Sequence, residues 1–107
     1  MSRHFAPARY GHREVTVVAG YDRPLNELFL QVFAREEEGA ATEGCLLYSS
    51  LHEPHRDWTD IDTVASKLAE LGIEVPATLL EAVYLDQLLD AGNRIAWHYN
   101  VQQRQQT

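Results

Sequence analysis

The sequence Tyr21-Asp22-Arg23-Pro24 combines residue types that can hold an anionic ligand. Asp22 can accept a hydrogen bond from the backbone two residues on, and Pro24 stiffens the turn that follows. Arg23 is then held extended, with a guanidinium group whose geometry suits a carboxylate or a phosphate. The favoured interpretation is a hairpin corner in which Arg23 pairs with a nearby acid. The alternative is a contact with a ligand or a partner.

A second cation follows a helix stop in Gly92-Asn93-Arg94. Gly92 and Asn93 are residue types that adopt positive φ where a helix ends. If the last strand pairs near the first, Arg94 lies beside Arg23 and the two guanidinium groups form an anion site. The candidate binding residues are therefore Tyr21, Asp22, Arg23, Asn93 and Arg94.

The segment His52-Glu53-Pro54-His55 brings two imidazoles close together. Zinc takes three or four protein ligands, and this pair supplies two of them. Pro54 also disfavours the helix on which an H-E-x-x-H motif works. We therefore expect a polar loop here, with no metal and no cofactor.

Sequence motifs of common enzymes are missing from the chain. Ser49 and Ser50 lack the G-x-S-x-G pattern of a nucleophile elbow, and neither GxxxxGK nor GxGxxG occurs. His98 is expected at an edge or on the surface rather than as a catalytic base. We predict no catalytic residue, and the sequence leans against an enzyme.

The charge of the chain limits its partners. It has 107 residues, enough for one domain, and a formal net charge of −7. Residues 1–13 hold three arginines and no acid, whereas the rest of the chain holds six cations and 16 acids. An acidic body repels a phosphate backbone, so a nucleic acid is not an expected partner.

The sequence favours a cytoplasmic protein. No apolar run approaches the ~18 residues that span a bilayer, so we expect no membrane partner. Residues 1–13 contain no apolar segment typical of a secretory signal. The single cysteine, Cys45, is expected to be a small buried strand residue, which fits a reducing compartment.

The pattern divides the chain into a flexible basic arm (residues 1–12), one domain (residues 13–101) and a frayed tail (residues 102–107). Residues 12–21 are rich in β-branched side chains, which is typical of a strand. Residues 25–35 fit either a helix or a strand, because their apolar positions match both periods. We favour the strand, since the run is aromatic, branched and bounded by turn signals.

Residues 44–51 are predicted to form a third strand, residues 59–72 and 75–93 two helices, and residues 94–101 a last strand. Thr59 or Asp60 is expected to cap the first helix, and Gly72 is expected to end it with a positive φ. The order β-β-β-α-α-β predicts a two-layer α+β fold, with a mainly antiparallel four-stranded sheet and both helices on one face. The second helix is expected to bury Leu79, Leu80, Val83 and Leu88, with Tyr84 or Leu85 beside them.

Two helices on one face leave the other face of the sheet uncovered. If that face carries Val18, Phe29, Phe33 and Tyr48, it is too apolar to face water, and large apolar patches mark interfaces. This predicts a protein partner or a second copy of the chain. The prediction depends on residues 25–35 being a strand.

The chain contains the four strings GYDRPL, LLYSSL, LxxLGIxVP at Leu68 to Pro76, and GNR. Together they resemble the pattern of a small family of uncharacterised bacterial proteins of about this length. The resemblance covers residues 19–94. It implies a bacterial cytosolic protein, and it brings neither an activity nor a catalytic residue.

Three hypotheses about function follow, in order of preference. The first is a non-enzymatic interaction module that uses the uncovered sheet face and the loop from Tyr21 to Pro24. The second is a protein or minor enzyme that binds a small anionic molecule near Arg23 and Arg94. The third is a metal site at His52 and His55.

Overall fold

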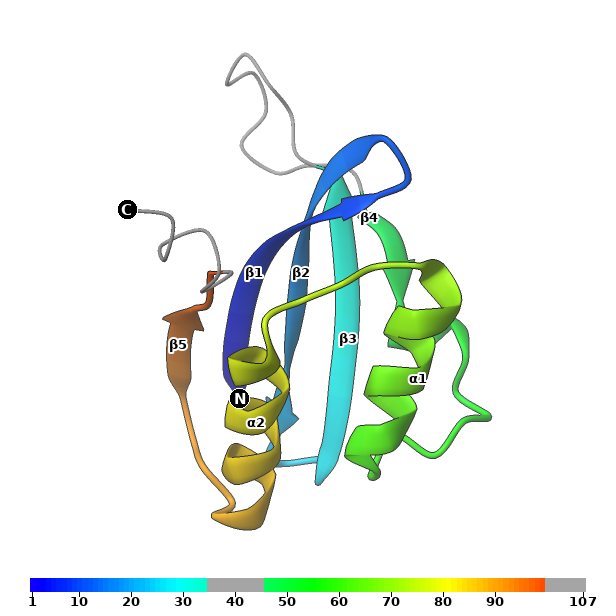
Figure 1. Cartoon of the computed structure of the whole chain (residues 1–107). Helices are drawn as coiled ribbons and strands as arrows, with labels where there is room; N and C mark the ends of the chain where they lie inside the picture. The colour runs from blue at the N-terminus through cyan, green and yellow to red at the C-terminus, as the bar shows by residue number, and fades with distance from the viewer. Residues whose placement is uncertain (35–45, 100–107) are drawn as a thin grey trace.

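The computed structural model describes residues 1–34 and 46–99. In this part of the chain, five strands form one mixed sheet in the order β4-β3-β2-β1-β5, with two helices on one face (Figure 1). The α+β class and the two layers confirm the sequence analysis. The sheet differs from the prediction because it has a fifth strand and because β5 runs parallel to β1.

The additional strand comes from the segment that was expected to be a flexible arm. β1, Ser2–Tyr10, pairs antiparallel with β2, Arg13–Asp22, through a turn in which Gly11 has a φ of +68°. The prediction of an arm over residues 1–12 is therefore wrong. Pro7 is tolerated because β5 pairs with β1 only as far as Phe5, so that β1 is an edge strand beyond that point.

The ambiguous segment is a strand. β3, Glu27–Ala34, pairs antiparallel with β2, so Leu28 and Leu30 face the helices. The turn before it places Asn26 at a φ of +58°, and the Asn26 N–H donates to the carbonyl of Arg23 at 3.1 Å. The predicted hairpin corner is confirmed.

The two edges of the sheet are short strands. β4, Leu46–Ser49, pairs with β3 and leads into the 3₁₀ helix η1, Ser50–His52. β5, Arg94–Trp97, pairs with the start of β1 at the opposite edge. Cys45 and the predicted tail, residues 102–107, lie outside the described residues.

α1, Ile61–Leu71, has the ends that its sequence predicts. The Asp60 carboxylate accepts a hydrogen bond from a first-turn N–H at 2.9 Å. Gly72 has a φ of +73°, and the Ile73 N–H donates to the carbonyl of Leu68 at 2.9 Å. This is the Schellman geometry that a glycine stop favours.

α2, Ala77–Leu88, lies over β1 and β2, while α1 lies over β3 (Figure 1). α2 turns Leu79, Val83 and Asp86 inward. The expectation that Leu88 is buried, with Tyr84 or Leu85 beside the buried residues, is wrong, since these three side chains are 60%, 44% and 51% exposed. α2 is apolar on most sides, so composition alone does not identify its buried face.

The chain turns after α2 at Asp90, which has a φ of +53°. Gly92 and Asn93, which were expected to adopt positive φ, do not. No helix among the described residues has the length and apolar character needed to cross a membrane.

Candidate functional site

The sheet face opposite the helices, here called the open face, carries a continuous set of apolar side chains. Strand alternation places Val18, Phe29 and Phe33 on it, as the sequence analysis expected. Tyr48 was expected there too but faces the helices, because it pairs with the buried Val32. The other apolar members are Phe5, Leu46, Leu51, Ile95, Trp97 and Tyr99.

A hollow of about 330 Å³ lies in the open face over β1 to β4. Near it, Gly20 allows β1 and β2 to approach closely, because a Cβ at this position would clash with the carbonyl of Ser2 and lie 2.9 Å from the Phe29 ring. Apolar walls with a few polar groups are typical of binding pockets. The lining includes Val18, Phe29, Gln31, Phe33, Ser49 and Leu51.

Three aromatic rings, here called the aromatic stack, lie at the β5 edge of the open face. The Phe5 and Trp97 rings stack with centroids 4.9 Å apart, and the Trp97 and Tyr99 rings with centroids 6.2 Å apart. Trp97 and Tyr99 are half exposed. The stack therefore presents to solvent the kind of aromatic surface that proteins usually bury.

Two of the five candidate binding residues, Tyr21 and Arg23, contact the same carboxylate. Tyr21 is buried, and its hydroxyl donates to Asp90 Oδ1 at 2.6 Å. Arg23 Nε donates to the other oxygen of the same carboxylate at 3.2 Å. The Tyr21 hydrogen bond lowers the pKa of Asp90 and raises the pKa of Tyr21. Asp22 lines the hollow on the open face instead.

Arg94 and Asn93 are also occupied by partners. Arg94 Nη1 donates to Asp86 Oδ1 at 3.3 Å, and Asn93 Oδ1 accepts from the Met1 nitrogen at 3.0 Å. Each of the two candidate guanidinium groups, Arg23 and Arg94, is therefore neutralised by an acid in or just after α2. This pairing weakens the case for an anion site.

A series of hydrogen bonds, here called the polar chain, connects α2, β1 and the residue after β5. Asp86 Oδ2 lies 2.6 Å from His4 Nε2, and His4 Nδ1 lies 2.9 Å from His98 Nε2. His98 Nδ1 lies 3.1 Å from Thr78 Oγ1. Asp86 and His4 are buried, whereas Thr78 is exposed.

Two arrangements of protons satisfy the polar chain when Asp86 is ionised. With a neutral His4, Thr78 donates to His98, His98 donates to His4, and His4 donates to Asp86. With a charged His4, His4 donates to both Asp86 and His98, and His98 donates to Thr78. Burial, then the charges of His4 and Arg94, lower the pKa of His98, which favours the neutral imidazole that both arrangements need. The polar chain lies on the helix side of the sheet. It joins α2 to β1 and to the residue after β5, and so helps to hold β5 on β1.

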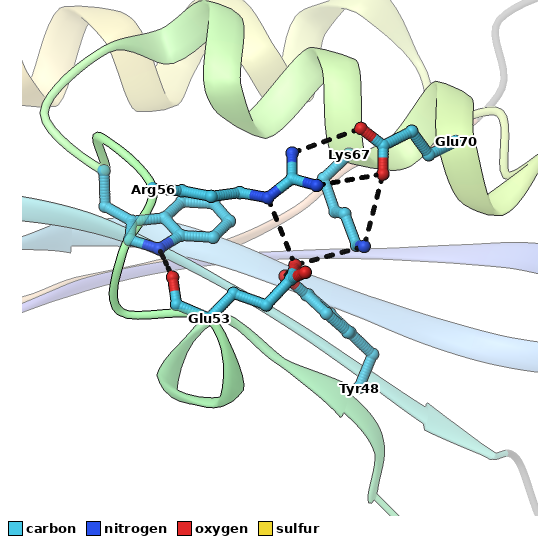
Figure 2. A network of polar contacts seen from close by, with 6 residues as sticks. Tyr48, Glu53, Arg56, Lys67 and Glu70 are labelled. Carbon is cyan, nitrogen blue, oxygen red and sulfur yellow. Dashed lines mark hydrogen bonds and ion pairs between the residues drawn. The ribbon is translucent and has the colours of Figure 1, made fainter.

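A second set of polar contacts, here called the α1 cluster, joins α1 to β4 and the loop that follows (Figure 2). Glu53 accepts from the Tyr48 hydroxyl at 2.7 Å and pairs with Lys67 at 3.1 Å. Arg56 donates two hydrogen bonds to Glu70 at 3.1 and 3.2 Å. Tyr48 and Lys67 lower the pKa of Glu53, and Arg56 and Lys67 lower the pKa of Glu70.

The two histidines near this cluster do not gather a ligand set. His52 packs edge-on against the Tyr48 ring, with centroids 6.3 Å apart, and both His52 and His55 are exposed. Within residues 1–34 and 46–99, no three histidine, cysteine or acidic side chains are placed to hold a metal ion.

The sequence analysis missed His4, Asp86 and Thr78. A signal existed for Asp86, because it follows Leu79 and Val83 at helical spacing and so continues the inward stripe.

Comparisons of the chain with protein-family models, curated proteins and solved structures found no match. The function is therefore argued from the geometry.

Proposed function

We propose that this protein is a non-enzymatic interaction module that binds a partner protein through the open face. The observation that carries the proposal is the exposure of this face. Leu51, at the hollow, is 79% exposed. Ile95, beside the half-exposed aromatic stack, is 67% exposed. A contiguous apolar patch of this kind marks an interaction surface, and aromatic side chains are enriched in interface cores.

A single-stranded nucleic acid is the main competing ligand, because its bases stack on aromatic side chains of exposed sheets. Charge argues against it. The open face carries Arg3 and Arg9 together with Glu14, Asp22 and Glu27. Single-strand binding uses a positively charged groove, whereas the described residues of this face have no excess of cations and the chain has a net charge of −7.

The expected setting is the bacterial cytoplasm. The single cysteine supports this placement, because proteins of oxidising compartments commonly carry disulfide pairs.

Site-specific photo-crosslinking inside the producing cell tests the proposal. A photoreactive residue at Leu51, at the hollow, should give discrete protein adducts. The same residue at Glu74, an exposed position between the helices, should give none. Equal adducts at both positions, or no adduct at Leu51, would overturn the proposed function. Mass spectrometry of the adduct identifies the partner.

A further inference from the structure

We infer that the partner that covers the open face is a second copy of this chain, docked so that the aromatic stack of each copy enters the hollow of the other. This inference rests on the proposed function, because it names the occupant of the same surface. Three observations carry it: strand register, exposed area and charge.

The register places the stack and the hollow on one line across the sheet. Trp97 pairs with Phe5, Phe5 with Val18, Val18 with Gln31, and Gln31 with Ser49. Trp97 thus lies at one end of the row, and the hollow covers the rest of it.

A two-fold axis parallel to the strands, placed over β2 between two facing sheets, keeps this row in register. It moves β5 of one copy over β4 of the other, and β1 over β3. Trp97 then lies above Ser49 and next to Gln31, at the β4 end of the hollow, and the reverse contact forms at the same time. Such an isologous contact closes at two copies, and facing sheets pack in this aligned way. Gln31 also offers a side-chain carbonyl to the indole N–H of Trp97, which needs an acceptor once buried.

The area of the open face fits a dimer. Its apolar side chains expose between 38% and 79% of their surface at Met1, Leu46, Leu51, Ile95, Trp97 and Tyr99. Together with the partly exposed phenylalanines they offer roughly 700 Å² on each copy, close to the ~800 Å² per partner of a standard interface.

A second apolar surface, the outer side of α2, is smaller. Its exposed members are Tyr84, Leu85, Leu88 and Leu89. They are fewer than the exposed apolar side chains of the open face, so this surface would bury less apolar area in a dimer.

Charge permits self-association at the open face. Its two arginines and three acids nearly balance, so most of the net charge of −7 lies elsewhere on the molecule. Two copies can therefore face each other without the repulsion that two acidic surfaces would cause.

Light scattering over a concentration series tests the inference with a pair of complementary variants. Wild type should reach twice the 12.2 kDa mass of the chain. Trp97→Lys places an ammonium in the hollow of the partner copy, and Gln31→Glu places a carboxylate beneath Trp97. Each variant alone should raise the dissociation constant at least about tenfold, because each buries an unpaired charge. An equimolar mixture should recover dimers, because one contact then pairs the introduced ammonium with the introduced carboxylate and the other contact is native.

Two controls keep the outcome unambiguous. Leu88→Glu, a matched change on the outer side of α2, should leave the mass unchanged. Trp97 fluorescence in a Trp58→Phe background should shift to the blue as concentration rises, since Trp58 is the other tryptophan and is already buried. Circular dichroism confirms that each variant is folded.

Three results would overturn the inference: a wild type that stays monomeric at about 1 mM, variants that fail to recover dimers on mixing, or a dimer lost in Leu88→Glu alone. None of them removes the proposed function if crosslinking at Leu51 yields a different protein. A lack of specific adducts at Leu51 would remove both.

Discussion

The two helices contact the sheet through two sets of polar groups that differ in connectivity and in burial. The polar chain under α2 is linear, and its inner end, Asp86, is 1% exposed. The α1 cluster is branched and partly exposed. In it Glu53 meets Tyr48, Arg56 and Lys67, and Glu70 is 48% exposed.

This difference determines how much stability is lost when one side chain of either set is removed. In a linear buried chain, loss of one member leaves its neighbour without a partner and without water, which costs the full desolvation of that group. In a branched cluster, each remaining acid keeps another cation and can also turn to solvent. Substitutions in the polar chain should therefore lower the stability of the protein more than substitutions in the α1 cluster.

Asp86→Ala should give the largest effect. It leaves His4 buried without its acceptor and removes the carboxylate that Arg94 contacts. Breaking a buried pair costs about 3–5 kcal/mol, which lowers Tm by more than about 10 °C in a domain of this size. Denaturant unfolding measures the loss. Glu81→Ala, at an exposed acid of the same helix, is the control and should change stability little. Equal losses of stability in the two variants would contradict the inference that the polar chain cannot lose a member without a large cost.

Acidification should come next in size and should affect the α2 side first. The pKa of His98 is lowered by burial and by the charges of His4 and Arg94, so the unfolded chain takes up this proton at a higher pH than the folded chain. The stabilisation is fully present above the ordinary histidine pKa of about 6.5 and is lost as pH falls through the folded value. Glu53 and Glu70 have lowered pKa values, so the α1 cluster weakens only below the ordinary glutamate pKa of 4.5.

Denaturant midpoints at several pH values between 7.5 and 5 measure this effect. His98→Asn should flatten the decline in that window, whereas His52→Asn, at an exposed histidine, should leave it unchanged. A wild-type stability that is constant down to pH 5 would show that His98 does not titrate differently in the folded state.

The sequence predicted the parts of the fold that local chemistry determines. Asp60 and Gly72 bound α1, and the turn before Glu27 forms a hairpin, because caps and turns depend on a few adjacent residues. The alternation in residues 27–34 correctly placed Phe29 and Phe33 on the open face. These positions follow from strand geometry once the strand is assigned.

The parts that the sequence did not predict depend on partners far along the chain. β1 was predicted to be a flexible basic arm, whereas its pairing with β5 joins residues about ninety positions apart. His4 and Asp86 become a pair only through that topology. Arg23 and Arg94 were expected to bind a ligand, but the same folding gives each of them an internal acid.

Lys67→Met, a substitution in the α1 cluster, should give the smallest effect. The substitution removes the charge that Glu53 and Glu70 share, together with the ammonium that lies 4.9 Å from the centre of the Tyr48 ring, but keeps a long apolar side chain. Glu53 retains the Tyr48 hydroxyl, and Glu70 retains both hydrogen bonds from Arg56. We expect Tm to fall by a few degrees at most, as for other partly exposed ion pairs. A double-mutant cycle with Glu70→Gln should show a small coupling, since Arg56 can compensate. A fall as large as that of Asp86→Ala would mean that the branches of the α1 cluster do not substitute for one another.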